Sequence, residues 1–204
     1  MDTHTDTQLP DHGPACRSLA GLLDAIDDKQ LGAPTPCPDY TVRELLAHLV
    51  GLTVAFRDAG KKALGPTTDT PPTEGLPQLE DGWRAALPAQ LDGLVEVWRS
   101  PDAWQGFTRA GGVDLPAQVA GIVALNELVV HGWDLARSTG QAYEVDRASL
   151  EATLAFLEPA AASAEAGDAP EGLFGPPVHV PADAPLLDRV IGLSGRRPDW
   201  RPGE

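Results

Sequence analysis

Residues 124–134 read ALNELVVHGWD, and three polar side chains in this stretch decide how the chain must fold. Glu127, His131 and Asp134 stand at positions i, i+4 and i+7, so a helix places all three on one face. Their neighbours are mostly apolar, which predicts that this helix lies inside a helical bundle. Burying such a row of side chains is costly unless something neutralises it. A divalent cation does so, because Glu and His four residues apart can bind the same ion.

A third ligand is expected from another helix, and His48 is the candidate. It lies within residues 45–50 (LLAHLV), which is an apolar setting for an imidazole ring. Taken alone, His48 is more simply a core histidine whose ring is satisfied by a backbone carbonyl or a carboxylate. Beside Glu127 and His131 the metal interpretation is favoured, since helical bundles commonly build such sites from facing helices. We therefore predict a metal site formed by His48, Glu127 and His131.

Three roles are open to Asp134. It can be a fourth ligand, a partner that orients an imidazole N–H, or a salt-bridge acceptor for Arg137. We expect the orienting role, in which Asp134 is also the candidate catalytic residue that accepts protons. Three protein ligands without an obvious fourth leave coordination positions open. Catalytic zinc sites keep such positions, whereas structural sites are usually closed and rich in cysteine, so the spacing indicates a catalytic site.

The composition indicates one globular helical domain outside the secretory pathway. Of 204 residues, 42% are hydrophobic and only 5% aromatic, which favours packed helices over a β-sandwich. The formal net charge of −15 repels phosphate backbones and anionic headgroups, so neither nucleic acid nor a membrane is expected as a partner. No apolar run approaches the roughly 20 residues of a membrane span, and the polar N-terminus resembles no signal or transit peptide. We therefore expect a cytoplasmic protein, with Cys16 and Cys37 as free thiols.

Helical periodicity predicts five helices separated by turn signals. Thr41 and Glu44 have the spacing of a capping box at the start of the second helix, and Gly140 is suited to stop the fourth. The expected helices span residues 15–28, 41–64, 79–99, 116–139 and 147–166. Loops are expected at 65–77 and 100–115, a short strand or extended packing segment at 178–180, and one more helix at 183–193.

Several stretches of the chain resemble a known family. Residues 35–51 (TPCPDYTVRELLAHLVG) are similar to the start of the second helix in actinobacterial DinB-like proteins, which are related to mycothiol-dependent maleylpyruvate isomerase. Residues 127–137 (ELVVHGWDLAR) and 139–141 (TGQ) are similar to their metal-bearing helix. Residues 174–178 (FGPPV) and 195–200 (GRRPDW) resemble the closing segments of one metal-binding subgroup.

The resemblance implies an all-α protein, a DinB-like four-helix bundle with an additional helix and a short C-terminal extension. It also implies a metal on His48, Glu127 and His131, usually zinc, with nickel as the alternative. DinB-like relatives are often dimers, so a homodimer is compatible with the resemblance. We divide the chain into a flexible N-terminal tail (1–13), a DinB-like metal-binding helical bundle (14–166) and a C-terminal extension that packs on the bundle (167–204).

Three functions remain open at this point. The favoured one is a metal-dependent S-transferase or isomerase, because the resemblance implies a low-molecular-weight thiol such as mycothiol, activated at the metal to attack a small-molecule electrophile. The second is a metal-dependent hydrolase that uses a metal-activated water, with Asp134 as the base. The third is a non-catalytic small-molecule-binding protein in which the metal only braces the helices.

Overall fold

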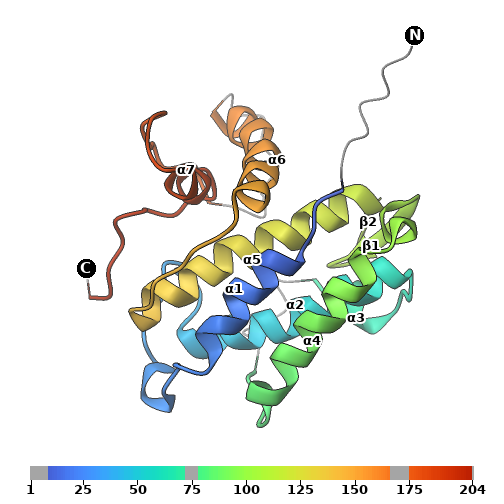
Figure 1. Ribbon diagram of the computed structural model, residues 1–204, viewed down its shortest axis with the longest axis horizontal. Coiled ribbons are helices and arrows are strands. Elements are labelled where there is room, and N and C mark those ends of the chain that lie inside the picture. The colour runs from blue at the N-terminus through green and yellow to red at the C-terminus, as the bar shows by residue number, and fades with distance from the viewer. Residues whose placement is uncertain (1–8, 72–77, 166–174, 204) are drawn as a thin grey trace.

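The computed structural model describes residues 9–71, 78–165 and 175–203, and helices dominate all three ranges (Figure 1). The helices are α1 (Gly13–Leu23), α2 (Val42–Lys61), α3 (Pro66–Asp69), α4 (Trp83–Trp98), α5 (Ala117–Thr139), α6 (Arg147–Glu165) and α7 (Leu186–Leu193). The remaining elements are the short 3-10 helices η1 (Asp28–Gln30) and η2 (Pro101–Trp104) and the strands β1 (Phe107–Ala110) and β2 (Val113–Pro116). The predicted all-α class is confirmed, with one small hairpin added.

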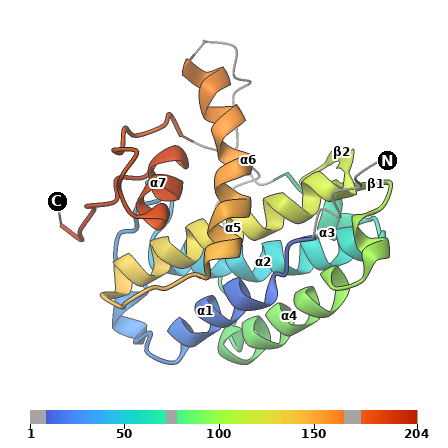
Figure 2. The same cartoon turned by 45° about the horizontal axis from the view of Figure 1, so that its top comes forward.

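Four of the helices form a bundle around one hydrophobic core. α1 and α2 each pack against both α4 and α5, so every helix of the four has two neighbours. Figure 2 shows α6 and α7 on the side of α5 away from α4, with α6 packed on α5 and α7 packed on α6. The predicted four-helix bundle with an additional helix is therefore confirmed. α5 is its central element, because it contacts helices on both of its sides.

The ends of α2 and α5 follow the sequence signals. The carboxylate of Glu44 accepts a hydrogen bond from the backbone N–H of Thr41, with 2.9 Å between nitrogen and oxygen, which caps the start of α2. α2 ends where Lys62 takes the left-handed conformation, with φ of 57°. α5 ends at Gly140, whose φ of 71° is one that glycine adopts without strain. Both helices therefore begin and end within three residues of their predicted bounds.

Helix α5 is packed closely enough at Gly121 to require glycine there. The rings of Trp98 and Trp104 lie against Gly121, and a Cβ atom there would come within 2.5 Å of the Trp104 ring. The Nε2 atom of His12 lies 2.9 Å from the Gly121 carbonyl oxygen, and both tryptophan rings flank the imidazole. The N-terminus of α1, the end of α4 and the start of α5 thus meet at a single point.

Residues 100–115, expected to be a loop, contain most of a β-hairpin instead. β1 and β2 pair antiparallel, with Phe107 opposite Pro116 and Ala110 opposite Val113. The two residues that join them are glycines with φ of 59° and 78°. A two-residue hairpin turn with positive φ at both positions favours glycine, so the Gly-Gly pair was the signal that the loop prediction overlooked.

The segments near both ends of the chain are described in part. Residues 1–8, in the predicted tail, and 166–174, at the predicted boundary of the extension, lie outside the described residues, and the division into three segments stays a prediction. Residues 178–180 form an extended packing segment rather than a strand, since Val178 donates a single backbone hydrogen bond to Gly192. The helix expected at 183–193 is α7.

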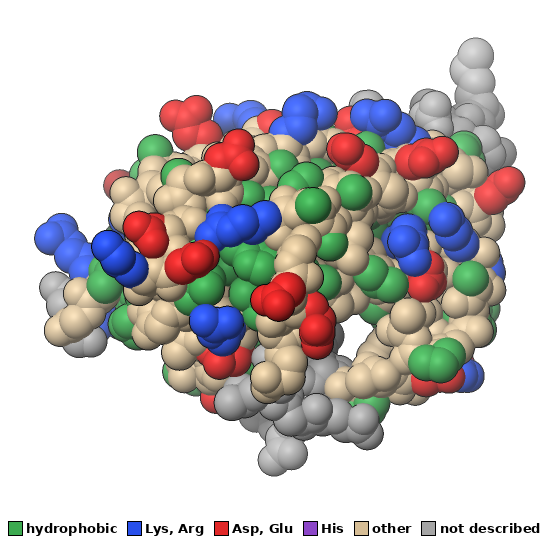
Figure 3. Space-filling view, turned by 90° about the horizontal axis from the view of Figure 1, so that it is seen from below, with side chains coloured by type: hydrophobic (Ala, Val, Ile, Leu, Met, Phe, Trp, Pro, Cys, Tyr) green, Lys and Arg blue, Asp and Glu red, His purple; other side chains and the backbone are tan. Residues whose placement is uncertain are grey.

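The apolar character of α5 is explained by its buried position, and the charged side chains are spread over the surface shown in Figure 3. α5 is long and apolar enough to cross a membrane by length and composition, but 83% of its most apolar window is buried inside the protein, as in the core helix of a bundle. On the face shown in Figure 3, basic and acidic side chains are interspersed. The excess of negative charge is therefore not gathered into one patch on that face.

Gly121→Ala is expected to lower the free energy of unfolding by about 1–3 kcal/mol, because the added methyl group collides with the Trp98 and Trp104 rings. Gly51→Ala is the matched control, since open space surrounds Gly51 on α2. This control should raise the free energy of unfolding by about 0.5–1 kcal/mol through helix propensity alone. Urea unfolding of the three proteins measures both changes, and equal effects of the two substitutions would contradict the close packing of α5.

His12 should make the protein less stable as the pH falls from 6.5 to about 4. Burial lowers the pKa of His12 from 6.5 to about 4, so above pH 6.5 the ring is neutral in both folded and unfolded chains. Below pH 6.5 only the unfolded chain takes up the proton, which lowers the free energy of unfolding by about 1.4 kcal/mol per pH unit. In urea titrations His12→Gln should lose this part of the slope, whereas His179→Gln, at an exposed position, should keep it. A wild-type slope in His12→Gln would refute the prediction.

Candidate metal centre

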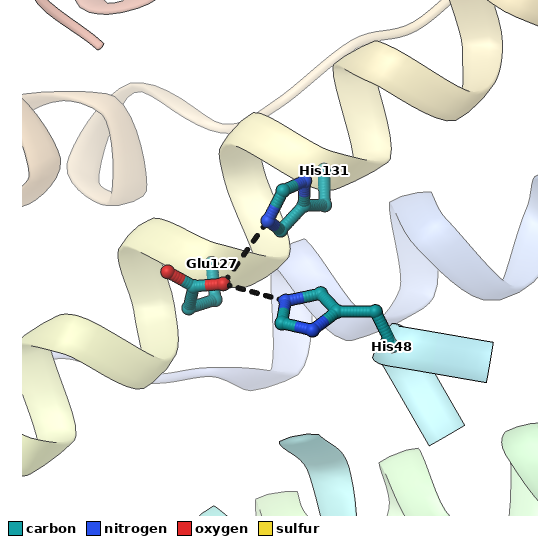
Figure 4. A group of neighbouring side chains, drawn as sticks. All are labelled: His48, Glu127 and His131. Atoms are coloured by element: carbon teal, nitrogen blue, oxygen red, sulfur yellow. Dashed lines mark hydrogen bonds and ion pairs between the residues drawn. The ribbon is translucent and has the colours of Figure 1, made fainter. Parts of the chain in front are cut away.

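The side chains of His48, Glu127 and His131 meet between α2 and α5 (Figure 4). One potential ligand atom from each residue lies within 4.8 Å of the other two. The Oε2 atom of Glu127 is 3.2 Å from Nε2 of His48 and 3.1 Å from Nε2 of His131. The structure therefore brings together all three residues that the sequence predicts as ligands.

The two helices position these side chains in different ways. Glu127 and His131 are one turn apart on α5, so the helix itself brings them together. Leu45 and Leu49 on α2 are completely buried and hold that helix in the bundle. His48 lies at the edge of this buried face, where its side chain is 18% exposed and reaches across to Glu127. The site is thus supported by the core and still open to solvent on the His48 side.

Asp134, one turn beyond His131, is fully buried and contacts the other nitrogen of its ring. Its Oδ2 atom lies 3.0 Å from Nδ1 of His131 and 3.1 Å from Nη2 of Arg196. A carboxylate can only accept, so Nδ1 of His131 carries a proton and Nε2 is the atom presented to Glu127. Asp134 is not among the three residues whose ligand atoms converge. Of its three predicted roles, the geometry matches the orienting one.

The alternative role of Asp134, as a salt-bridge acceptor for Arg137, does not match the structure. Arg137 is exposed, donates a hydrogen bond to the carbonyl of Pro198, and stacks its guanidinium 5.3 Å from the centre of the Trp133 ring. The cation beside Asp134 is Arg196, which follows α7 and whose side chain is only 11% exposed. A fully buried carboxylate needs a buried partner, and Arg196 meets this requirement where the exposed Arg137 does not.

The charges of the site stabilise one another. Burial by itself opposes the ionisation of Glu127 and the protonation of His131. The two imidazoles nevertheless hold the pKa of Glu127 well below its usual range. The carboxylates of Glu127 and Asp134 likewise raise the pKa of His131 to about 9. Two histidines therefore share one carboxylate. A divalent cation held between the three side chains would meet two imidazole nitrogens and one oxygen, a donor set that suits zinc.

Neither cysteine joins this donor set within the described residues, and both are free thiols, as predicted. Burial raises the pKa of Cys37 to about 11 and that of Cys16 to about 12, so both stay protonated at neutral pH. The exposed fractions of the His48, Glu127 and His131 side chains are 18%, 14% and 9%. The site is therefore partly exposed through His48 and Glu127, while His131 is buried. Three protein ligands leave coordination positions that a small molecule could complete on an ion bound there.

Two uncharacterized proteins of Mycobacterium tuberculosis are similar to nearly the whole chain. They are MT0763 of strain CDC 1551 / Oshkosh and Rv0738 of strain ATCC 25618 / H37Rv. Each is 29% identical over 188 residues, which cover 91% of this chain and 95% of the relative. The similarity therefore extends over both the bundle and the segments that follow it.

Two solved structures share the fold, a mycothiol-dependent maleylpyruvate isomerase and a histidine-to-alanine mutant of such an isomerase. The first matches with a TM-score of 0.58 and 21% identity over 84% of this chain and 77% of that chain. The mutant matches with a TM-score of 0.59 and 20% identity over 80% of this chain and 75% of that chain. These matches confirm the DinB-like fold. The family model for the mycothiol maleylpyruvate isomerase N-terminal domain matches residues 12–136, more than half of the chain, and this protein belongs to that family.

Proposed function

We propose that this protein is a cytoplasmic metal-dependent enzyme that uses a low-molecular-weight thiol of the mycothiol type. Its reaction is the S-transfer or isomerisation of a small-molecule electrophile. The observation that carries the proposal is the convergence of two imidazoles and one carboxylate at a site that is partly exposed on the His48 side. The family description and the names of the two solved structures, which specify mycothiol, support the choice of thiol.

We propose His48, Glu127 and His131 as the ligands of one divalent ion, zinc or alternatively nickel. When bound, such an ion lowers the pKa of a thiol that reaches it and so favours the nucleophilic thiolate. The protein supplies no thiol of its own to this donor set, since Cys16 and Cys37 lie outside the converging group in the described residues. This arrangement supports a thiol that arrives from solution as the soft ligand.

We propose that Asp134 acts through His131. Both of its oxygens are engaged, Oδ2 by His131 and Arg196 and Oδ1 by the Nε of Arg196 at 3.4 Å. Asp134 is also completely buried, which supports a role in holding the imidazole over direct contact with a substrate. The expected effect is a fixed orientation and higher basicity of the His131 ligand.

The purified protein, prepared without a His-tag, should contain about one zinc or nickel ion per chain by elemental analysis. His131→Ala and Glu127→Ala should each lose the ion, because two ligands cannot hold it tightly. His179→Ala and Glu151→Ala are matched controls on exposed histidine and glutamate side chains, and both should keep the wild-type metal content. A wild-type protein that takes up no metal, even after reconstitution, would contradict the site and with it every metal-dependent function.

The zinc-loaded protein should consume a low-molecular-weight thiol in the presence of a generic aromatic electrophile, faster than the metal-free protein. His131→Ala should react at the background rate, while the His179→Ala control should match the wild type. The measurement is loss of free thiol over time, with mycothiol and cysteine compared. No turnover above background with any thiol would refute the transferase function. Ester cleavage without added thiol would indicate the hydrolase instead.

A further inference from the structure

The two histidines of the site are held by different interactions. His131 is oriented by a hydrogen bond from Nδ1 to Asp134. At His48, no residue in the described ranges forms a hydrogen bond to Nδ1, and only Nε2 has a partner, Glu127. The His48 ring is instead contacted by two other rings. Tyr40 lies 5.4 Å away between ring centres with a tilt of 34°, and His131 meets it edge-on at 4.8 Å and 79°.

Tyr40 is well placed to hold a neighbouring ring because its own backbone is tied down. Its N–H donates a hydrogen bond to the Cys37 carbonyl at 3.1 Å, and its carbonyl oxygen accepts one from the hydroxyl of Thr35 at 2.7 Å. The next residue, Thr41, is the N-cap of α2, the helix that carries His48. Tyr40 is therefore attached directly to the element whose histidine it contacts.

A stacked ring restricts an imidazole in a way that a single hydrogen bond to Nε2 does not. Rotation about the second side-chain torsion of a histidine is soft, so an unsupported His48 would turn Nε2 away from Glu127 at little cost. The Tyr40 ring lies tilted against the imidazole on one side, and the edge contact with His131 limits rotation toward the other ligand. Tilted aromatic pairs at this separation are attractive.

We propose that Tyr40 is the positioning residue for His48, holding its Nε2 toward the point where an ion would bind. It performs for His48, by ring stacking, the task that Asp134 performs for His131 by hydrogen bonding. The inference rests on the metal-binding function proposed above and deepens it. Removing partners that orient metal-bound histidines weakens metal affinity in other sites by about 10–100-fold, so the ring should have a measurable effect.

The test is a titration of the full-length, metal-free protein with cobalt(II), followed by its visible absorption bands. Tyr40→Leu, which removes the ring, should raise the cobalt dissociation constant about tenfold or more and shift the bands. Tyr40→Phe keeps the ring and should remain within about twofold of the wild type. Phe107→Leu, at an exposed aromatic residue on β1, is the control for losing an aromatic ring and should have no effect.

Each outcome separates this inference from the proposed function. A wild-type protein that binds no cobalt would overturn both. If the wild type binds cobalt and Tyr40→Leu matches it in affinity and spectrum, only the role of Tyr40 falls. That role also falls if Tyr40→Phe is as weak as Tyr40→Leu, or if Tyr40→Leu lowers only the melting temperature of the metal-free protein. Should Tyr40→Leu not fold, Tyr40→Met removes the ring with an unbranched side chain and gives the same comparison.

Discussion

The row of charged and polar side chains on α5 is the constraint on which the rest of the structure depends. Glu127, His131 and Asp134 lie on a helix that is otherwise apolar and mostly buried, where an unpaired carboxylate is costly. Each therefore needs a partner, and the partners come from elements far apart in sequence. His48 on α2 contacts Glu127, and Arg196 after α7 contacts Asp134. The contacts that neutralise the buried carboxylates of α5 thus connect the bundle to the C-terminal segment.

This connection gives the C-terminal segment a place in the site. The family match covers residues 12–136 and includes His48, Glu127, His131 and Asp134. Arg196 lies beyond it, yet its guanidinium faces both oxygens of the carboxylate that orients His131. A chain ending at the family match would lack the guanidinium that contacts Asp134 from the C-terminal side. The segment after α6 therefore contributes to the electrostatic balance of the candidate site, not only to the covering of α5.

Much of this arrangement could be predicted because the signals are local. The N-cap of α2 follows from a three-residue spacing, the end of α5 from a glycine, and the pairing of Glu127 with His131 from helical periodicity. His48 could be selected because an imidazole in an apolar helix needs a polar partner. The hairpin was missed although its Gly-Gly turn is also local, since strands of four residues show too little alternation to stand out from a loop.

Arg196 and Tyr40 could not be predicted because their roles depend on tertiary contacts. Arg137 is three residues from Asp134 and so was the obvious partner by helix spacing, whereas Arg196 is 62 residues away. Burial decides between them. Arg137 is exposed and solvated, so its attraction to a buried carboxylate would be weakened by water. The side chain of Arg196 is only 11% exposed, so its attraction to Asp134 is screened much less. Sequence spacing shows which partners a side chain could reach along its own helix. Which of the reachable partners pairs with a buried carboxylate depends on how far each is removed from water. That burial is a property of the folded chain and cannot be read from the spacing.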